Sequence, residues 1–173
     1  MKKSILVLFF CTLFSFAQET TVTDSVAEKN VITKIILLRH AEKEKDGSKD
    51  PKLSKQGMLR AEKLNFMLSD FSIDKLFSTA YIRTQKTLGA ISQSRNITIS
   101  NYEARDKNFA EQLVRNEMGK TIIVAGHSNT IPALVNVLIK EDKYKDLSEE
   151  EYGKLWILTF SNEELIDCSL FNF

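Results

Sequence analysis

Continuous apolar runs alternate along the chain with segments whose apolar residues recur at helical spacing. Runs such as KIILL and TIIVA are typical of strands buried on both faces of a sheet. The apolar runs predict strands at residues 34–38, 73–78, 97–100, 121–125, 155–160 and 165–173. The helical spacing and helix signals predict helices at residues 54–69, 81–93, 105–118 and 131–139.

The order of these elements predicts the fold class. Strands and helices alternate through most of the chain, which favours an α/β fold. We expect a three-layer sandwich with a mostly parallel central sheet flanked by helices, and a terminal pair of strands turning at residues 162–164. Ser54 is suited to cap the first helix, and Gly119 to end the third. Ligands of such sheets bind beyond the carboxyl ends of the strands.

The first 17 residues have the pattern of a secretory signal peptide. Lys2 and Lys3 precede an apolar run at residues 5–16, and Ser15 and Ala17 supply the small residues that precede a cleavage site. An uncleaved N-terminal anchor is the alternative, although the run is short for a membrane span. We expect an exported protein, periplasmic or secreted, that meets the membrane only through this signal. A polar tether at 18–33 and one domain at 34–173 follow.

The composition after the signal argues against several classes of partner. Removal of Lys2 and Lys3 leaves 22 basic and 23 acidic side chains, a net charge of −1, so there is no basic field for nucleic acid. Cys11 leaves with the signal, so Cys168 has no partner for an internal disulfide. Its apolar surroundings favour a role as a small core residue. The sequence does not indicate an oligomeric state.

Polar residues collect where the predicted strands end. Arg39 and His40 follow the first strand, Ser78 and Thr79 the second, and Gly126-His127-Ser128-Asn129 the TIIVA strand. The guanidinium group of an arginine matches phosphate oxygens two at a time. Arg83 adds a second such group near a helix start, where free backbone amides also favour an anion. The sequence therefore predicts a pocket for a tetrahedral phosphate.

Structural roles compete with this interpretation at single positions. Arg83 alone is equally explained as a solvated helix residue, Asn129 as a helix cap, and Lys43 as a loop lysine. The argument for a site is that the set meets at one predicted edge. His40 and His127 lack the spacing of zinc ligands, so we expect no metal and no cofactor. The chain also has no Gly-x-Ser-x-Gly nucleophile motif.

Four segments, in this order, resemble the motifs of the histidine phosphatase superfamily, which has the phosphoglycerate-mutase-like fold. They are residues 37–43 (LLRHAEK), 50–64 (DPKLSKQGMLRAEKL), 78–88 (STAYIRTQKTL) and 124–134 (VAGHSNTIPAL). The resemblance covers most of residues 34–138, and it marks the chain as a small single-domain member with an RHAEK motif.

The resemblance implies a two-step phosphoryl transfer without a metal. His40 is then the nucleophile that forms a phosphohistidine, while Arg39, Arg83 and His127 hold the phosphate oxygens. Ser128 and Asn129 are expected as further phosphate contacts, and Lys43 at the pocket entrance. The substrate implied is a small phosphorylated molecule.

The general acid has two candidates between the second arginine and the second histidine. Glu103 follows the predicted strand at 97–100 and is favoured, because Asp106 is suited to cap the following helix. Some small family members lack an acid and act on good leaving groups such as phosphohistidine. Only residues 84–126 separate Arg83 from His127, which leaves little room for the lid of a mutase and favours hydrolysis.

Three functions follow from these residues. The first is a metal-independent phosphoric monoester hydrolase of the histidine acid type. The second is a protein phosphohistidine phosphatase, which the short chain favours and export disfavours. The third is a phosphate-binding module without catalysis, which the presence of His40 disfavours because binding alone needs no nucleophile.

Overall fold

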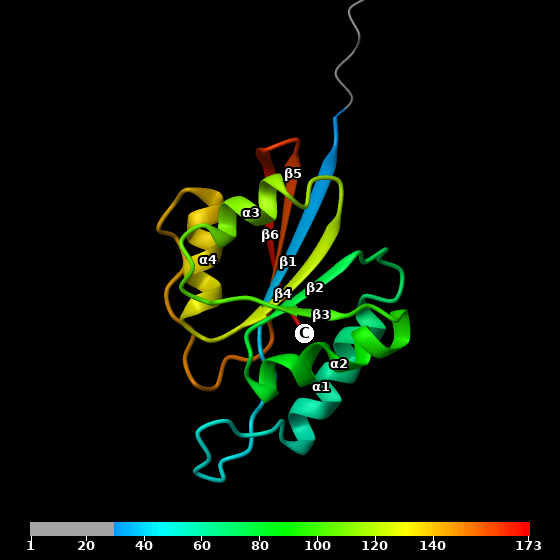
Figure 1. Cartoon of the computed structure of the whole chain (residues 1–173). Helices are drawn as coiled ribbons and strands as arrows, with labels where there is room; N and C mark the ends of the chain where they lie inside the picture. The colour runs from blue at the N-terminus through cyan, green and yellow to red at the C-terminus, as the bar shows by residue number, and fades with distance from the viewer. Residues whose placement is uncertain (1–29) are drawn as a thin grey trace, which may run out of the picture.

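The computed structural model describes residues 30–173, which form one six-stranded sheet with helices on both faces (Figure 1). The strands are β1 (Ile32–Arg39), β2 (Lys75–Ser78), β3 (Ile99–Asn101), β4 (Thr121–Gly126), β5 (Lys154–Ser161) and β6 (Glu164–Asn172). The helices are α1 (Lys55–Met67), α2 (Ile82–Arg95), α3 (Phe109–Arg115) and α4 (Thr130–Ile139). The predicted α/β class and the mostly parallel sheet are confirmed.

The first strand begins earlier than the sequence predicts. Ile32 and Thr33 belong to β1, where they pair with Ser161 and Phe160 of β5. The predicted boundary between tether and domain is therefore two residues late, because the longer antiparallel partner extends the pairing. The predicted signal peptide at 1–17 and the rest of the tether, up to residue 29, lie outside the described residues.

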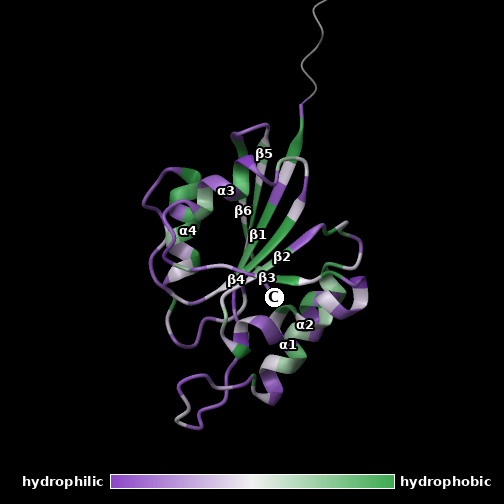
Figure 2. Cartoon of the chain, viewed as in Figure 1, coloured by the Kyte–Doolittle hydropathy of each residue, from purple (hydrophilic) through white to green (hydrophobic). Residues whose placement is uncertain are grey.

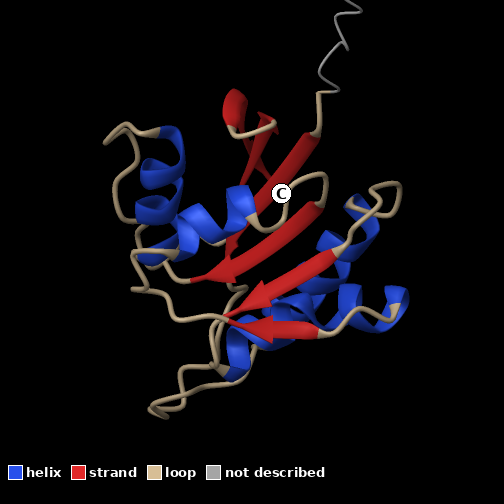
Figure 3. Cartoon of the chain, turned by 45° about the horizontal axis from the view of Figure 1, so that its top comes forward, coloured by secondary structure: helices blue, strands red, loops and turns tan. Residues whose placement is uncertain are grey.

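The sheet has a parallel half and an antiparallel half. Its strand order is β3-β2-β4-β1-β5-β6, and the first four of these strands run parallel. β5 and β6 form the predicted terminal hairpin, which joins the sheet antiparallel to β1. Figure 3 shows the arrowheads of the parallel strands directed toward one edge. Their carboxyl ends therefore meet there, as the sequence predicts for a ligand site.

Two apolar cores lie on opposite faces of the sheet. One core is packed between the sheet and the pair α3 and α4, and the other between the sheet and the pair α1 and α2. Four consecutive residues of β1, Ile35–Leu38, are fully buried and divide between the two cores. Hydropathy colouring shows the apolar strands inside and polar loops outside (Figure 2). These buried strands provide rigid backbone for whatever follows their ends.

The predicted cap of the first helix is confirmed, but the third helix is much shorter than predicted: it lies between Asn108 and Asn116, so Asp106 does not cap it and Gly119 does not end it. Ser54 caps α1 by accepting a hydrogen bond from the Gly57 N–H. α3 spans only Phe109–Arg115, not 105–118. The Asp106 carboxylate accepts a hydrogen bond from the Asn108 N–H at 2.9 Å, which holds this part of the chain in a turn. Residues 104–108 are therefore a loop that lies beside the sheet edge.

Within residues 30–173, no helix has both the length and the apolar character needed to cross a membrane. 

Candidate active site

The strand order places the ends of four parallel strands next to one another. Arg39 of β1 is paired with Gly126 of β4, and Ser78 of β2 with both Ala125 of β4 and Asn101 of β3. The residues that follow each strand are therefore neighbours although they are far apart in sequence. The His40 N–H donates to the Gly126 carbonyl oxygen at 2.9 Å, which ties the first two strand ends together.

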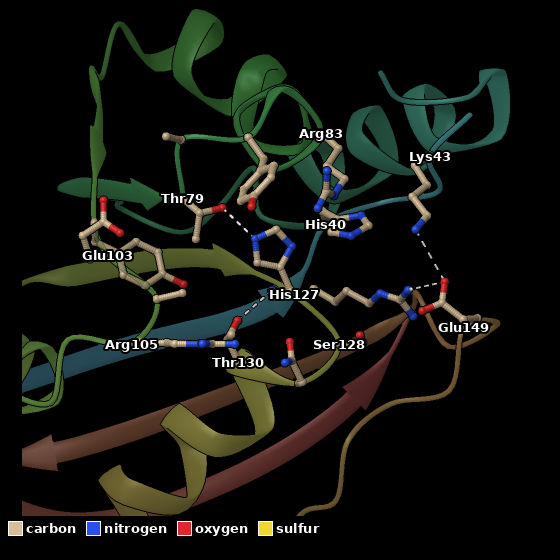
Figure 4. A pocket seen from close by; sticks show the side chains of 16 residues that line it. His40, Lys43, Thr79, Arg83, Glu103, Arg105, His127, Ser128, Thr130 and Glu149 are labelled. Atoms are coloured by element: carbon tan, nitrogen blue, oxygen red, sulfur yellow. Dashed lines mark hydrogen bonds and ion pairs between the residues drawn. The ribbon is translucent and has the colours of Figure 1, made fainter. Parts of the chain in front are cut away.

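A pocket of about 620 Å³ opens at this edge (Figure 4). All eight candidate residues predicted from the sequence line it: Arg39, His40, Lys43, Arg83, Glu103, His127, Ser128 and Asn129. They follow the ends of the three strands β1, β3 and β4 or lie at the start of α2 and α4, so the fold brings the predicted set together.

His40 is held in the state that suits a nucleophile. Its side chain is buried, with 3 % exposed, and Nδ1 lies 2.7 Å from the Ala41 carbonyl oxygen. A carbonyl oxygen only accepts, so Nδ1 carries the proton and Nε2 keeps its lone pair. Burial, reinforced by the charges of Arg83 and Arg39, lowers the pKa to about 3, although the hydrogen bond to Ala41 opposes the shift. At neutral pH the ring is therefore uncharged.

Arg39 is a fully enclosed cation with free hydrogen-bonding capacity. Only 1 % of it is exposed, and its guanidinium stacks 4.1 Å above the Tyr152 ring. Nη1 donates to the carbonyl oxygens of Ser148 and Glu151 at 2.6 and 3.1 Å. Nε is buried without a partner. A buried N–H without an acceptor is costly, and an anion in the pocket would supply one.

Arg83 is fixed in a similar way in the first turn of α2. Its Nη1 lies 3.3 Å from an Asp50 carboxylate oxygen, and its guanidinium packs 4.3 Å above the Tyr81 ring. Asp50 also accepts from the Ile82 N–H, so one carboxylate holds both the arginine and the helix start. Arg83 Nε is buried without a partner as well. Two arginines thus present unpaired donors at one pocket.

His127 follows β4 and faces His40 edge-on, with ring centroids 5.5 Å apart. Its Nε2 lies 3.0 Å from the Thr79 hydroxyl. Because Thr84 donates to the Tyr81 carbonyl oxygen, the Thr79 hydroxyl donates to Thr84 and accepts from His127 Nε2–H. Burial and the neighbouring arginines lower the pKa of His127 to about 4. In the free pocket this ring is a neutral donor.

Ser128 and Asn129 form the turn that enters α4. Asn129 occupies the N-cap position of this helix, but its side chain makes no capping hydrogen bond. Cap positions normally use such a side chain, so its amide is available to the pocket that it lines.

The two candidate acids lie in different surroundings. Glu103 lines the pocket, on the side where β3 ends (Figure 4). Asp106 is not among the lining residues, and its carboxylate binds the Asn108 N–H in the turn before α3. The geometry thus favours Glu103 over Asp106 as a group that reaches a ligand.

Sequence reasoning missed several lining residues. Glu149 lies at the mouth, 3.6 Å from both Arg39 Nη2 and Lys43 Nζ. It belongs to a polar segment between α4 and β5, where nothing in the sequence distinguishes it from its acidic neighbours. Arg105 and Tyr81 also line the pocket. Both are first residues of predicted helices, at 81–93 and 105–118. Only their position beside the strand ends in the folded chain identifies them as pocket residues.

Among the residues that the structure describes, no three His, Cys, Asp or Glu side chains converge in a group that could hold a metal ion. The groups at the centre of the pocket are two positively charged arginines and two neutral imidazoles. The arginines provide hydrogen-bond donors for an anion. 

Part of the chain matches a known protein family. The family model described as "Histidine phosphatase superfamily (branch 1)" matches residues 35–104, which include Arg39, His40, Arg83 and Glu103. The match begins in β1 and ends just beyond β3. No curated protein matches the chain.

Solved structures of several phosphatases and a mutase share the fold. A mycobacterial glucosyl-3-phosphoglycerate phosphatase is 14% identical with a TM-score of 0.66, covering 82% of this chain and 98% of its own. The protein histidine phosphatase SixA, complexed with tungstate, is 15% identical with a TM-score of 0.62, covering 80% and 96%. Phosphoglycerate mutase from Plasmodium falciparum is 20% identical with a TM-score of 0.58, covering 83% and 91%.

Proposed function

We propose that the protein is a phosphatase that hydrolyses phosphomonoesters through a phosphohistidine on His40. The observation that carries the proposal is the free Nε2 of a neutral, buried imidazole beside two arginines whose Nε donors lack partners. A nucleophile and donors for the phosphoryl oxygens thus share one pocket. The match to the histidine phosphatase superfamily supports the same chemistry.

In the first step, His40 Nε2 attacks phosphorus and forms a P–N bond while the P–O bond to the leaving group breaks. The guanidinium groups of Arg39 and Arg83 neutralise the phosphoryl oxygens, and His127 supplies an N–H to them once the bound phosphoryl charge raises its pKa and the ring is protonated. Glu103, when protonated, gives its proton to the departing oxygen. The products of this step are the free alcohol and phosphohistidine.

In the second step, water attacks phosphorus on the face opposite His40. The P–N bond breaks, Glu103 takes a proton from the water, and inorganic phosphate leaves. The hydrogen bond from His40 Nδ1–H to Ala41 persists through both steps and stabilises the imidazole as it becomes positively charged. Hydrolysis rather than mutase chemistry fits the short connection between Arg83 and His127.

The two histidines of the chain make the intermediate unambiguous to locate. Brief exposure to p-nitrophenyl phosphate with a chelator present, followed by a quench, should label His40, detectable by mass spectrometry. H127A provides the matched control, because it should turn over slowly yet still carry the label on His40. A His40→Ala variant that retains turnover, or a label found on His127 alone, contradicts the proposal.

The same assay tests the general acid. Removing a positioned acid typically costs 10²–10⁴-fold in rate. We expect kcat/KM, which reports the first step alone, to fall about a hundredfold in E103Q on an alkyl phosphate and less than about threefold on p-nitrophenyl phosphate, whose leaving group needs no proton. D106N provides the control and should keep both activities. Equal losses of E103Q on the two substrates contradict an acid role.

Protein phosphohistidine is a second candidate substrate, supported by the likeness to SixA over 96% of that chain. Its leaving group is an imidazole that needs no proton from Glu103, so kcat/KM for this substrate should stay unchanged in E103Q. Relative kcat/KM values for a phosphohistidine peptide and a sugar phosphate decide between the two. A non-catalytic phosphate-binding module is excluded if His40 is labelled.

We also propose that the protein is exported. The support is the pattern of residues 1–17: Lys2 and Lys3, an apolar run and small residues at 15 and 17. N-terminal sequencing of the protein from its natural source should begin at Gln18. An intact Met1 or a cytosolic location contradicts export with cleavage.

A further inference from the structure

Glu149 places a carboxylate where an anionic ligand would meet the pocket cations. Oε2 lies 3.6 Å from Arg39 Nη2 and 3.6 Å from Lys43 Nζ (Figure 4). Arg39 and Lys43 both line the pocket around His40. One carboxylate therefore bridges two of the cations that a phosphoryl group would use.

The remaining contacts of Arg39 are of a different kind. Nη1 is occupied by the carbonyl oxygens of Ser148 and Glu151, which belong to the backbone beside Glu149. Nε is unpaired, and Nη2 meets only the distant carboxylate. Because Nε is enclosed by protein atoms, Nη2 is the nitrogen of Arg39 left for a phosphate contact. Glu149 competes for Nη2.

Burial shows which member of the ion pair is free to move. Arg39 is 1% exposed, whereas the Glu149 side chain is 69% exposed. An exposed carboxylate 3.6 Å from its cation is held weakly, and little interaction free energy is lost when it rotates into water. Arg39 stays in place because its backbone acceptors and Tyr152 fix it.

A second cavity gives the displaced carboxylate a place to go. It measures about 940 Å³ and shares Lys43 and Glu149 with the phosphate pocket. The Lys43–Glu149 pair therefore forms the wall between the two spaces. Rotation of Glu149 toward Glu150 and Tyr152 on the second side would open the Nη2 edge of Arg39 to a ligand.

We propose that Glu149 is a specificity-determining residue, whose carboxylate competes with the ligand for Arg39 and Lys43. A doubly charged phosphoryl group on Arg39 Nη2 and Lys43 Nζ outcompetes it, whereas singly charged anions do so poorly. The same competition weakens the hold on inorganic phosphate after hydrolysis. The inference rests on the proposed function only in taking a phosphoryl group as the ligand.

The experiment compares E149Q with the matched control E150Q, because Glu150 is exposed, carries the same charge and lines only the second cavity. Titration calorimetry of the full chain measures the dissociation constant for inorganic phosphate at fixed ionic strength. We expect E149Q to bind about fivefold tighter than wild type, as loss of one exposed ion pair implies. E150Q should stay within about twofold.

Three results overturn the inference. Equally tighter binding of phosphate in both variants would indicate an effect of net charge alone, and weaker binding in E149Q would indicate that Glu149 orients Arg39. The third is no binding of phosphate by any of the proteins. Sulfate and acetate extend the test, because E149Q should gain more for singly charged acetate. Turnover is measured separately. Tighter phosphate binding by E149Q without a phosphohistidine supports the role of Glu149 and overturns the phosphatase proposal alone.

Discussion

The two imidazoles of the pocket should make the stability of the fold depend on pH. Burial, with the charges of the nearby arginines, lowers the pKa of His40 to about 3 and that of His127 to about 4. In the unfolded chain both rings titrate near their ordinary pKa of 6.5. Between these values the unfolded state binds more protons than the folded state. The free energy of unfolding therefore falls as the solution is acidified below pH 6.5.

The size of the effect follows from the same values. A ring that stays neutral in the fold costs about 1.36 kcal/mol for each pH unit below 6.5. At pH 5 this amounts to about 2 kcal/mol for His40, which is almost fully buried. His127 is partly exposed, so water screens its shift and about 1 kcal/mol is the better expectation. The combined loss is a large part of the ~5–15 kcal/mol that holds a domain folded.

Urea unfolding at pH 7 and pH 5 measures this loss. Trp156, the single tryptophan, is fully buried and reports unfolding by fluorescence. The variant H40N keeps an N–H donor for the Ala41 carbonyl but cannot take up a proton. Its loss of stability between the two pH values should be about 2 kcal/mol smaller than that of wild type, and the loss of H127N about 1 kcal/mol smaller. Carboxylates titrate alike in all three proteins. Equal losses in all three refute the reasoning.

Two further substitutions test how the pocket is supported. D50N keeps an acceptor for the α2 start but loses the ion pair to Arg83. We expect kcat/KM to fall about tenfold, while the free energy of unfolding in urea stays within about 1 kcal/mol of wild type. An unchanged kcat/KM would show that Arg83 needs no carboxylate. G57A would bring a Cβ within 2.1 Å of the Glu42 carbonyl oxygen, so we expect the free energy of unfolding to fall by about 1–3 kcal/mol. In the control G89A the new Cβ meets nothing within 4 Å, so the free energy of unfolding should stay the same or rise by up to about 1 kcal/mol. Similar stability of the two alanine variants contradicts the close approach.

The site was predictable because its main residues directly follow buried strands. A run such as residues 34–38 is recognisable from its apolar character, and Arg39 and His40 come next in the sequence. In a parallel sheet the strand ends are neighbours whatever the length of the crossover. Because His127 also follows a buried strand, the sequence places it at the same sheet edge as His40. The helices between them did not need to be known.

The missed features depend on contacts between distant parts of the chain. Glu149 meets Arg39 only because the segment before β5 passes the end of β1. Asp50 lies 33 positions before Arg83, and nothing local links them. The late start of the helix predicted at 105–118 has a local cause in Asp106, but propensity alone does not reveal that its side chain binds the Asn108 N–H.

The cations of the pocket both hold the ligand and set the charge state of the imidazoles. Burial, together with the charges of Arg83 and Arg39, lowers the pKa values of His40 and His127 in the free pocket, so the proposed nucleophile His40 is uncharged before any ligand arrives. A bound phosphoryl dianion offsets those charges, and the pKa of each ring then rises toward its ordinary value. His127 becomes a stronger donor to the phosphoryl oxygens once they are present, and His40 is better able to carry the positive charge of the P–N intermediate. In the proposed reaction, burial and the two arginines thus keep the nucleophile neutral in the free site, and the negative phosphoryl group that the arginines hold makes its positive charge tolerable once it has reacted.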